Sequence, residues 1–120
     1  MAELLHITER SLWEAARASG TYEMSTRGQT LKDVGFIHCS QRHQLPQVAK
    51  LFYSDIDPRD LVVLVIDSER ITSPVRYEAP DPGARSDDTL SESERFPHIY
   101  GPLPVEAVVA EEPWSGEAPA

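Results

Sequence analysis

The chain contains a single cysteine among its 120 residues, so it cannot close a disulfide within itself. Scarcity of cysteine is typical of proteins of the reducing cytoplasm, and we therefore expect a cytoplasmic protein. Long apolar runs are also missing, because the longest, residues 61–66, is far short of the roughly 18 residues that a membrane span needs. The first residues show no basic stretch followed by an apolar one, so we predict neither a signal peptide nor membrane association.

Positive charge is scarce as well: 11 Lys and Arg residues stand against 20 Asp and Glu, which gives a net charge of -9. The basic residues are scattered along the chain, whereas a protein that binds nucleic acids nonspecifically clusters them against the phosphates. We therefore expect no nonspecific nucleic-acid binding. One anionic small molecule needs only a few charges or backbone amides, so a nucleotide-type ligand remains compatible with this composition.

The proportions of hydrophobic residues, 40%, and of charged residues, 26%, are typical of a folded globular protein. A chain of this length has room for one hydrophobic core, which favours one domain. We predict a single α+β domain over residues 1–110, followed by an acidic, flexible tail over residues 111–120.

Six short segments predict β-strands, because they are rich in β-branched residues or alternate between apolar and polar ones. They span residues 4–7, 36–39, 61–66, 75–78, 96–100 and 105–110. The third segment is continuously apolar, which predicts a central strand covered on both faces. Residues 79–95 are acidic and contain two prolines, and a loop of that length is typical either of a disordered segment or of a functional lid.

Two helices are predicted in the N-terminal half of the chain. Ser11 and Glu14 have the spacing of a capping box, and Gly20 is a natural helix end. Ser40 is a predicted N-cap of the second helix. The buried face of that helix is expected to comprise Leu45, Val48, Ala49, Leu51 and Phe52.

Candidate chemistry is concentrated in two segments, residues 35–40 and residues 96–101. In the first, His38 and Ser40 share one face of a strand, which predicts a ligand-binding wall. Cys39 alternates to the opposite face, so we expect a buried, inert thiol.

The second segment places Phe96, His98 and Tyr100 on one strand face, which is more aromatic and titratable surface than a routine core strand carries. We predict that Phe96 and Tyr100 contact a ligand and that His98 is an acid–base group. Glu78, from the preceding strand, is the candidate catalytic carboxylate. Both segments must meet His6 of the first strand if they form one site.

Three histidines on three strands could bind zinc with an open position for water. No His-x-His or His-x-x-x-His pair anchors such a site in this sequence, so we predict no metal ligands.

Several of these segments together resemble one family pattern. They lie around His6, at residues 35–40, at residues 61–67, around Tyr77 and Glu78, and at residues 96–101. It is that of a small bacterial family known as domain of unknown function 952, and the resemblance runs over about residues 4–109. A more distant resemblance is to the ADP-ribosyltransferase fold, especially its RNA 2'-phosphotransferase branch. That branch also has an early strand histidine, a His-x-Ser segment and an apolar strand that ends in Ile-Asp.

The second resemblance implies a fold of mostly antiparallel strands in two small sheets, with NAD or an ADP-ribosyl group as substrate in a cleft between them. It implies that His6 and Ser40 hold the ligand, with His38 beside them. The acidic residue that such transferases use would be Glu78 or Glu106.

We therefore expect a protein that binds NAD or an ADP-ribosyl-type nucleotide and acts as a transferase or a glycohydrolase, with no other cofactor predicted. Three other interpretations are a non-catalytic binding module with the same pocket, a metal-dependent hydrolase and a purely structural partner domain.

Overall fold

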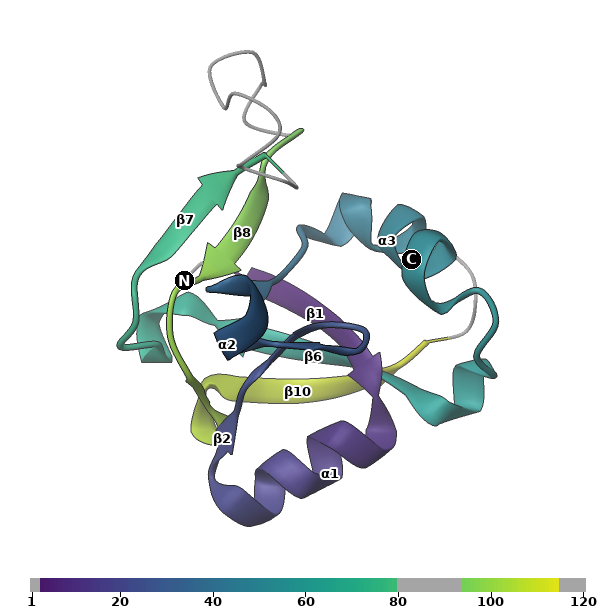
Figure 1. Ribbon diagram of the computed structural model, residues 1–120, viewed down its shortest axis with the longest axis horizontal. Helices are drawn as coiled ribbons and strands as arrows, with labels where there is room; N and C mark the ends of the chain where they lie inside the picture. The colour runs from purple at the N-terminus through teal and green to yellow at the C-terminus, as the bar shows by residue number, and fades with distance from the viewer. Residues whose placement is uncertain (1–2, 80–93, 115–120) are drawn as a thin grey trace.

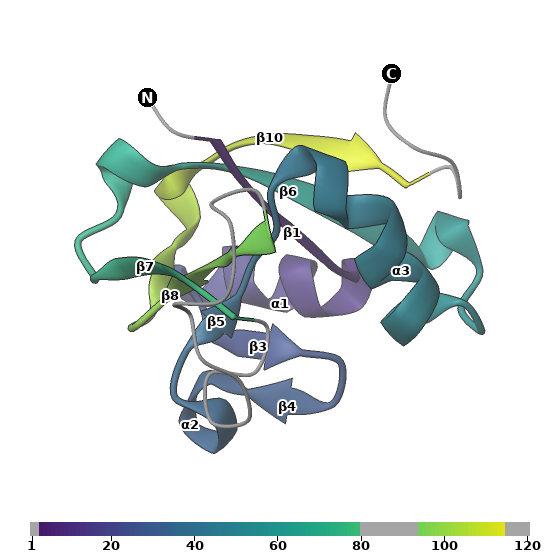
Figure 2. The same cartoon turned by 90° about the horizontal axis from the view of Figure 1, so that it is seen from above.

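The computed structural model describes residues 3–79 and 94–114, and within them the chain folds as α+β (Figures 1 and 2). Two three-stranded sheets and two two-stranded pairs, all antiparallel, are present in this part of the chain. The strands are β1 (Glu3–Glu9), β2 (Thr21–Tyr22), β3 (Met24–Thr26), β4 (Gln29–Thr30), β5 (Ile37–His38), β6 (Leu61–Asp67), β7 (Val75–Glu78), β8 (Phe96–Ile99), β9 (Leu103–Pro104) and β10 (Val108–Pro113). The helices are α1 (Arg10–Ser19), α2 (Leu31–Val34) and α3 (Leu45–Tyr53).

This arrangement confirms the predicted fold class, and the helices lie in the first half of the chain as expected. Most of the loop predicted at residues 79–95, and the end of the predicted tail, lie outside the described residues. No helix in the described ranges is long and apolar enough to cross a membrane.

The central sheet has the order β1-β6-β10, and all seven residues of β6 are buried. Because side chains alternate along a strand, the two faces of β6 belong to two different hydrophobic clusters. One face packs with α1, through Leu4, Trp13, Ala16, Val62, Leu64 and Ile66. The other packs with α3, through Leu5, Ile7, Leu45, Val48, Ala49, Val63 and Val65. Figure 1 shows α1 and α3 on opposite sides of the sheet, so the prediction of a central, doubly covered strand is confirmed.

The second sheet has the order β5-β8-β7 and is joined to the central sheet directly after β5. The Leu5 amide donates to the Ser40 carbonyl at 2.9 Å, and the Ser40 amide donates to the Leu5 carbonyl at 2.7 Å. These two hydrogen bonds bring the edge of β1 to the end of β5. The predicted edge strand at residues 75–78 is confirmed as β7.

Both predicted N-caps are wrong, because strand pairing just before each helix sets where the helix begins. β1 continues to Glu9, which pairs with Leu61, so α1 begins at Arg10 without any side-chain cap, and Ser11 already lies inside the helix. Ser40 is held in extended backbone by Leu5, so the chain first forms a 3₁₀ turn and α3 begins only at Leu45. Gly20, by contrast, ends α1 with a φ of 99°, as expected.

The predicted buried face of α3 is only partly correct. Leu45, Val48 and Ala49 are buried, but Leu51 is 68% exposed and Phe52 is 41% exposed. Tyr53 takes their place, because it lies eight residues after Leu45 and therefore on the same side of the helix.

The last strand is displaced toward the C-terminus relative to its prediction. Residues 105–107 form a 3₁₀ turn, and β10 pairs with β6 as far as Pro113. Glu111 and Glu112, which we assigned to the tail, are therefore strand residues. Arg42 supports this edge by binding Glu112 at 3.1 Å and Glu3 at 3.0 Å.

Gly101, which follows β8, can be tested by substitution. A Cβ at this position would lie 2.7 Å from Ser73 Cβ and closer still to the Ser73 hydroxyl. We expect Gly101→Ala to lower the free energy of unfolding by about 1–3 kcal/mol, measured by urea denaturation. In a double-mutant cycle, Ser73→Gly should remove part of that cost. An additive cycle would contradict the steric explanation.

Candidate functional site

His6 lies in β1 and is 3% exposed, yet both of its ring nitrogens have partners. Nδ1 is 2.7 Å from the carbonyl oxygen of His38, and Nε2 is 2.7 Å from the hydroxyl of Tyr22. A carbonyl only accepts, so Nδ1 carries the proton and donates. Burial lowers the pKa of His6 to about 4, so the ring is neutral at pH 7 and Nε2 accepts from Tyr22.

The Tyr22 hydroxyl is also 2.8 Å from Thr8 Oγ1. The Tyr22 hydroxyl has one proton and donates it in the hydrogen bond to His6 Nε2. The Thr8 hydroxyl is therefore the donor in the second contact, and the Tyr22 oxygen accepts. The resulting chain of hydrogen bonds runs from Thr8 through Tyr22 and His6 to the backbone of His38. His6 was expected to hold a ligand, but its polar atoms are engaged in joining three strands.

A pocket opens beside His6, between β1, β3, the end of β5 and α3. Its empty volume, including the part open to solvent, is about 220 Å³. The lining residues are His6, Ile7, Ser25, Thr26, His38, Ser40, Val48 and Tyr53. Three of them, His6, His38 and Ser40, were predicted from the sequence as ligand-binding residues, and the fold brings them together.

The polar side chains of the pocket contrast with His6, because the structure gives them no hydrogen bond to another described residue. The Ser25 hydroxyl is the clearest case: Ser25 is 1% exposed and its Oγ has no partner in the described ranges. The His38 ring is half-buried and lies against the rings of Phe96 and His98. Burial, and then the proximity of His98 and His6, lower the pKa of His38 to about 3, so it is neutral at pH 7.

A second polar group lies behind His38 in the sheet of β5, β8 and β7. His98 is fully buried, and its Nδ1 is 3.0 Å from Glu78 Oε1. The Tyr100 hydroxyl donates to the same carboxylate oxygen. Sheet register explains the contact, because Glu78 pairs with Phe96 and is therefore diagonal to His98 on the same face.

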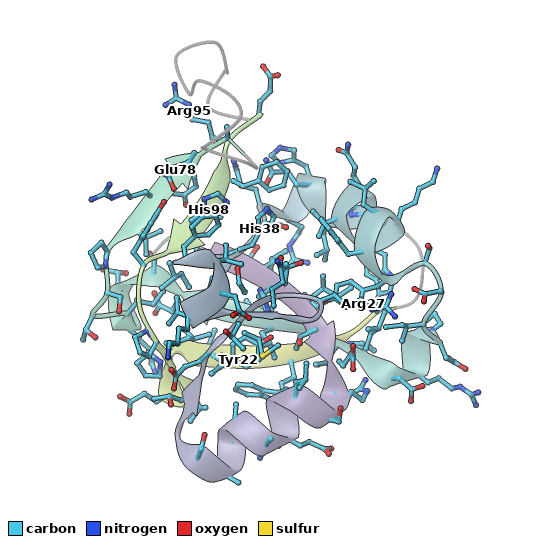
Figure 3. The ribbon with its side chains drawn as sticks, in the orientation of Figure 1. Tyr22, Arg27, His38, Glu78, Arg95 and His98 are labelled. Carbon is cyan, nitrogen blue, oxygen red and sulfur yellow. The ribbon has the colours of Figure 1, made fainter. Side chains whose placement is uncertain are left out.

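Aromatic contacts connect this group to the pocket. The Phe36 ring stacks on His98 with centroids 4.0 Å apart, and the His38 ring lies 5.0 Å from His98. Phe96 lies 5.2 Å from His38 on its other side. Figure 3 shows Glu78, His98 and His38 in this order from β7 toward the centre of the molecule.

The predicted site residues thus form one connected cluster, but only some of them line the pocket. His6, His38 and Ser40 line the pocket, whereas Glu78 and His98, predicted as catalytic, do not. Phe96 and Tyr100, predicted to contact a ligand, also lie outside the lining. Cys39 is fully buried and faces the core, as predicted, and burial raises the pKa of its thiol. Glu106, the alternative carboxylate, is exposed and makes none of these contacts.

Sequence reasoning missed Ser25 and Thr26, which belong to β3, and Tyr53 at the end of α3. The stretch that holds β3 reads as a polar loop, and Figure 2 shows β3 beside β5, a contact that only the tertiary fold creates. Tyr53 could have been found, since its helical spacing from Leu45 was visible in the sequence.

No group of three or more His, Cys, Asp or Glu side chains in the described ranges is arranged to hold a metal ion. The geometry therefore lends no support to the metal-dependent hydrolase.

The chain belongs to the family described as "Protein of unknown function (DUF952)", whose profile matches residues 7–111. No curated protein matches the chain. The crystal structure of CC0527 from Caulobacter crescentus is 29% identical, with a TM-score of 0.68 over 93% of this chain and 85% of that chain. The solution NMR structure of CC0527 has the same identity and a TM-score of 0.63, covering 94% of this chain and 84% of that chain. The matched residues include the pocket lining apart from His6, and the Glu78–His98 group.

The neutral state of buried His6 makes a prediction about acid stability. Its pKa is lowered from 6.5 to about 4 on folding, so between these values the unfolded chain binds the proton and the folded chain does not. Stability is complete above pH 6.5 and falls as the pH drops toward 4, by about 3 kcal/mol from this residue. In His6→Asn this part of the pH dependence should disappear, as measured by urea denaturation from pH 7 to pH 4.

Asparagine keeps an amide near the Nδ1 position, and His43→Asn, at an exposed histidine, is the control. If His6→Asn does not fold, an NMR titration of the His6 ring in the wild-type protein measures its pKa directly. A His6 ring that becomes charged above pH 5 would contradict the prediction.

The Glu78 carboxylate makes a second prediction, because it accepts hydrogen bonds from both His98 and Tyr100. Glu78→Ala removes the acceptor and should lower the free energy of unfolding by about 2–4 kcal/mol. Glu78→Gln keeps one acceptor oxygen and should cost less, and Glu106→Ala should cost nothing measurable. The NMR signals of the His38 ring should shift in Glu78→Ala. Unchanged signals would show that the Glu78–His98 pair does not position His38.

Proposed function

We propose that this protein binds the ribosyl portion of a nucleotide-type ligand, NAD or an ADP-ribosyl group, in the pocket beside His38. The observation that supports the proposal is the set of polar side chains with no hydrogen bond to another described residue around one small pocket. They are Ser25, Thr26, His38, Ser40 and Tyr53. A ribose presents adjacent hydroxyls that both donate and accept, and neutral imidazole and hydroxyl groups are suitable partners for them.

The size of the pocket limits which part of the ligand enters it. The space that the centre of a water-sized molecule can occupy inside the pocket is about 10 Å³, which is room for about one water molecule or one hydroxyl group. We therefore place the ribose ring at the open mouth of the pocket with one hydroxyl directed inward, and the rest of a dinucleotide extends over the surface outside. The proposed ADP-ribosyltransferase-like fold agrees with this placement, since the pocket borders the junction of the two three-stranded sheets.

The reaction we propose is cleavage of the glycosidic bond of NAD. The bond between the ribose C1' and the nicotinamide nitrogen breaks, and nicotinamide leaves with the electron pair. The ribosyl cation is then captured by water in a glycohydrolase, or by an acceptor hydroxyl in a transferase, with loss of one proton. Neutral His38 is placed to accept a hydrogen bond from a ribose hydroxyl while positive charge develops on the ring.

A non-catalytic binding module is the second candidate, and one observation favours it. The Glu78 carboxylate is bonded to His98 and Tyr100 and does not line the pocket. No Asp or Glu is among the described lining residues, so a carboxylate that would stabilise the ribosyl cation directly is not in place.

Calorimetry with NAD and ADP-ribose tests binding, and an assay for released nicotinamide tests turnover. We expect ADP-ribose to bind, and His38→Gln to weaken binding about tenfold, the loss typical of one hydrogen bond. His43→Gln, at an exposed histidine, is the matched control and should bind like the wild type.

Nicotinamide release that is lost in His38→Gln would establish the enzyme. Binding without release would establish the module. If neither NAD nor ADP-ribose binds, the proposal is wrong.

A further inference from the structure

Ser25 combines burial with an unused hydroxyl. It lies in β3, is 1% exposed and lines the pocket, and its Oγ has no hydrogen-bond partner in the described ranges. Burying a hydroxyl without a partner lowers stability, so nearly all buried hydroxyls in folded proteins are paired. An unpaired serine hydroxyl does not stabilise the fold at this position. Its hydrogen-bond partner is therefore expected to be a bound ligand.

The lining of the pocket is uncharged. Its described side chains are hydroxyls, two imidazoles and two aliphatic groups, with no Lys, Arg, Asp or Glu among them. His6 and His38 are neutral at pH 7, because burial lowers their pKa values to about 4 and about 3. An anionic group that entered would lose its hydration and meet no opposite charge, and the net charge of -9 adds to this cost.

We infer that Ser25 is a ligand-binding residue, and that the pocket accepts one hydroxyl of an uncharged ribosyl ring and rejects a ribose that carries a phosphate on that hydroxyl. The inference rests on the proposed function, since it specifies the substrate class of the same pocket. It separates this protein from the RNA 2'-phosphotransferase branch, whose substrate carries such a phosphate. The diphosphate of ADP-ribose remains compatible, because it would lie outside the pocket.

The first test compares two ligands by calorimetry. ADP-ribose is titrated against an analogue that carries a phosphate on the 2-hydroxyl of its terminal ribose. We expect the analogue to bind at least about tenfold more weakly, because its phosphate must be desolvated without a countercharge. Equal or tighter binding of the analogue overturns the inference and leaves the proposed function standing.

The second test uses Ser25→Ala, which should separate binding from stability. Loss of one hydrogen bond to the ligand should weaken ADP-ribose binding about tenfold. The melting temperature should stay the same or rise, because the variant no longer buries an unpaired hydroxyl. Ser11→Ala, at an exposed serine of α1, should change neither quantity.

A Ser25→Ala variant that melts earlier and binds normally would show that the hydroxyl is structural, and the inference would fail.

The third test works without a nucleotide. D-ribose is added to the ¹⁵N-labelled protein, and amide shifts at Ser25, Thr26 and Ser40 are followed by NMR. If ribose shifts these signals but ADP-ribose does not bind, the proposed function fails and the inference on the pocket holds. If neither compound affects the pocket, both are wrong.

Discussion

The way in which the two sheets meet depends on the hydrogen bonds that the ring of His6, buried in the first strand, requires. His6 is almost fully buried, so each of its nitrogens needs a partner from the protein, and the partners come from two other strands. The His38 carbonyl belongs to β5 of the second sheet, and the Tyr22 hydroxyl belongs to β2. Together with the backbone bridge between Leu5 and Ser40, these bonds fix how the second sheet meets the central one, and so they set the walls of the pocket.

Polar groups around this junction fall into two sets that have different consequences for stability. His6, Tyr22 and the Glu78–His98 pair have their hydrogen bonds within the protein, so their burial is compensated. Ser25 is buried without compensation, and the two hydrophobic clusters on either side of β6 supply the stability that permits it. Trp13 in α1 also buries its ring N–H without a partner among the described residues, but Ser25, unlike Trp13, lines the pocket.

Features set by local periodicity could be predicted from the sequence. The apolar run of β6 gave a central strand, and alternation of side chains placed Cys39 in the core and His38 on the other face. Helix starts could not be predicted, because Ser11 and Ser40 have good cap sequences but their backbones follow from strands paired far along the chain. Ser25 was missed for the same reason: its segment is polar and short, and only packing beside β5 makes it a buried wall.

The geometry also assigns different roles to the three histidines, which the sequence could not do. Both nitrogens of His6 are bonded, and a ring held neutral by burial has no proton to exchange at pH 7 without breaking those bonds. Tyr53, the other titratable group of the described lining, has its pKa raised to about 12 by burial and stays a neutral hydroxyl. His98 lies 5.0 Å from His38 and is hydrogen-bonded to the Glu78 carboxylate. Burial first, and the proximity of His98 and His6 second, keep the His38 imidazole uncharged at pH 7, which suits it to bind hydroxyl groups.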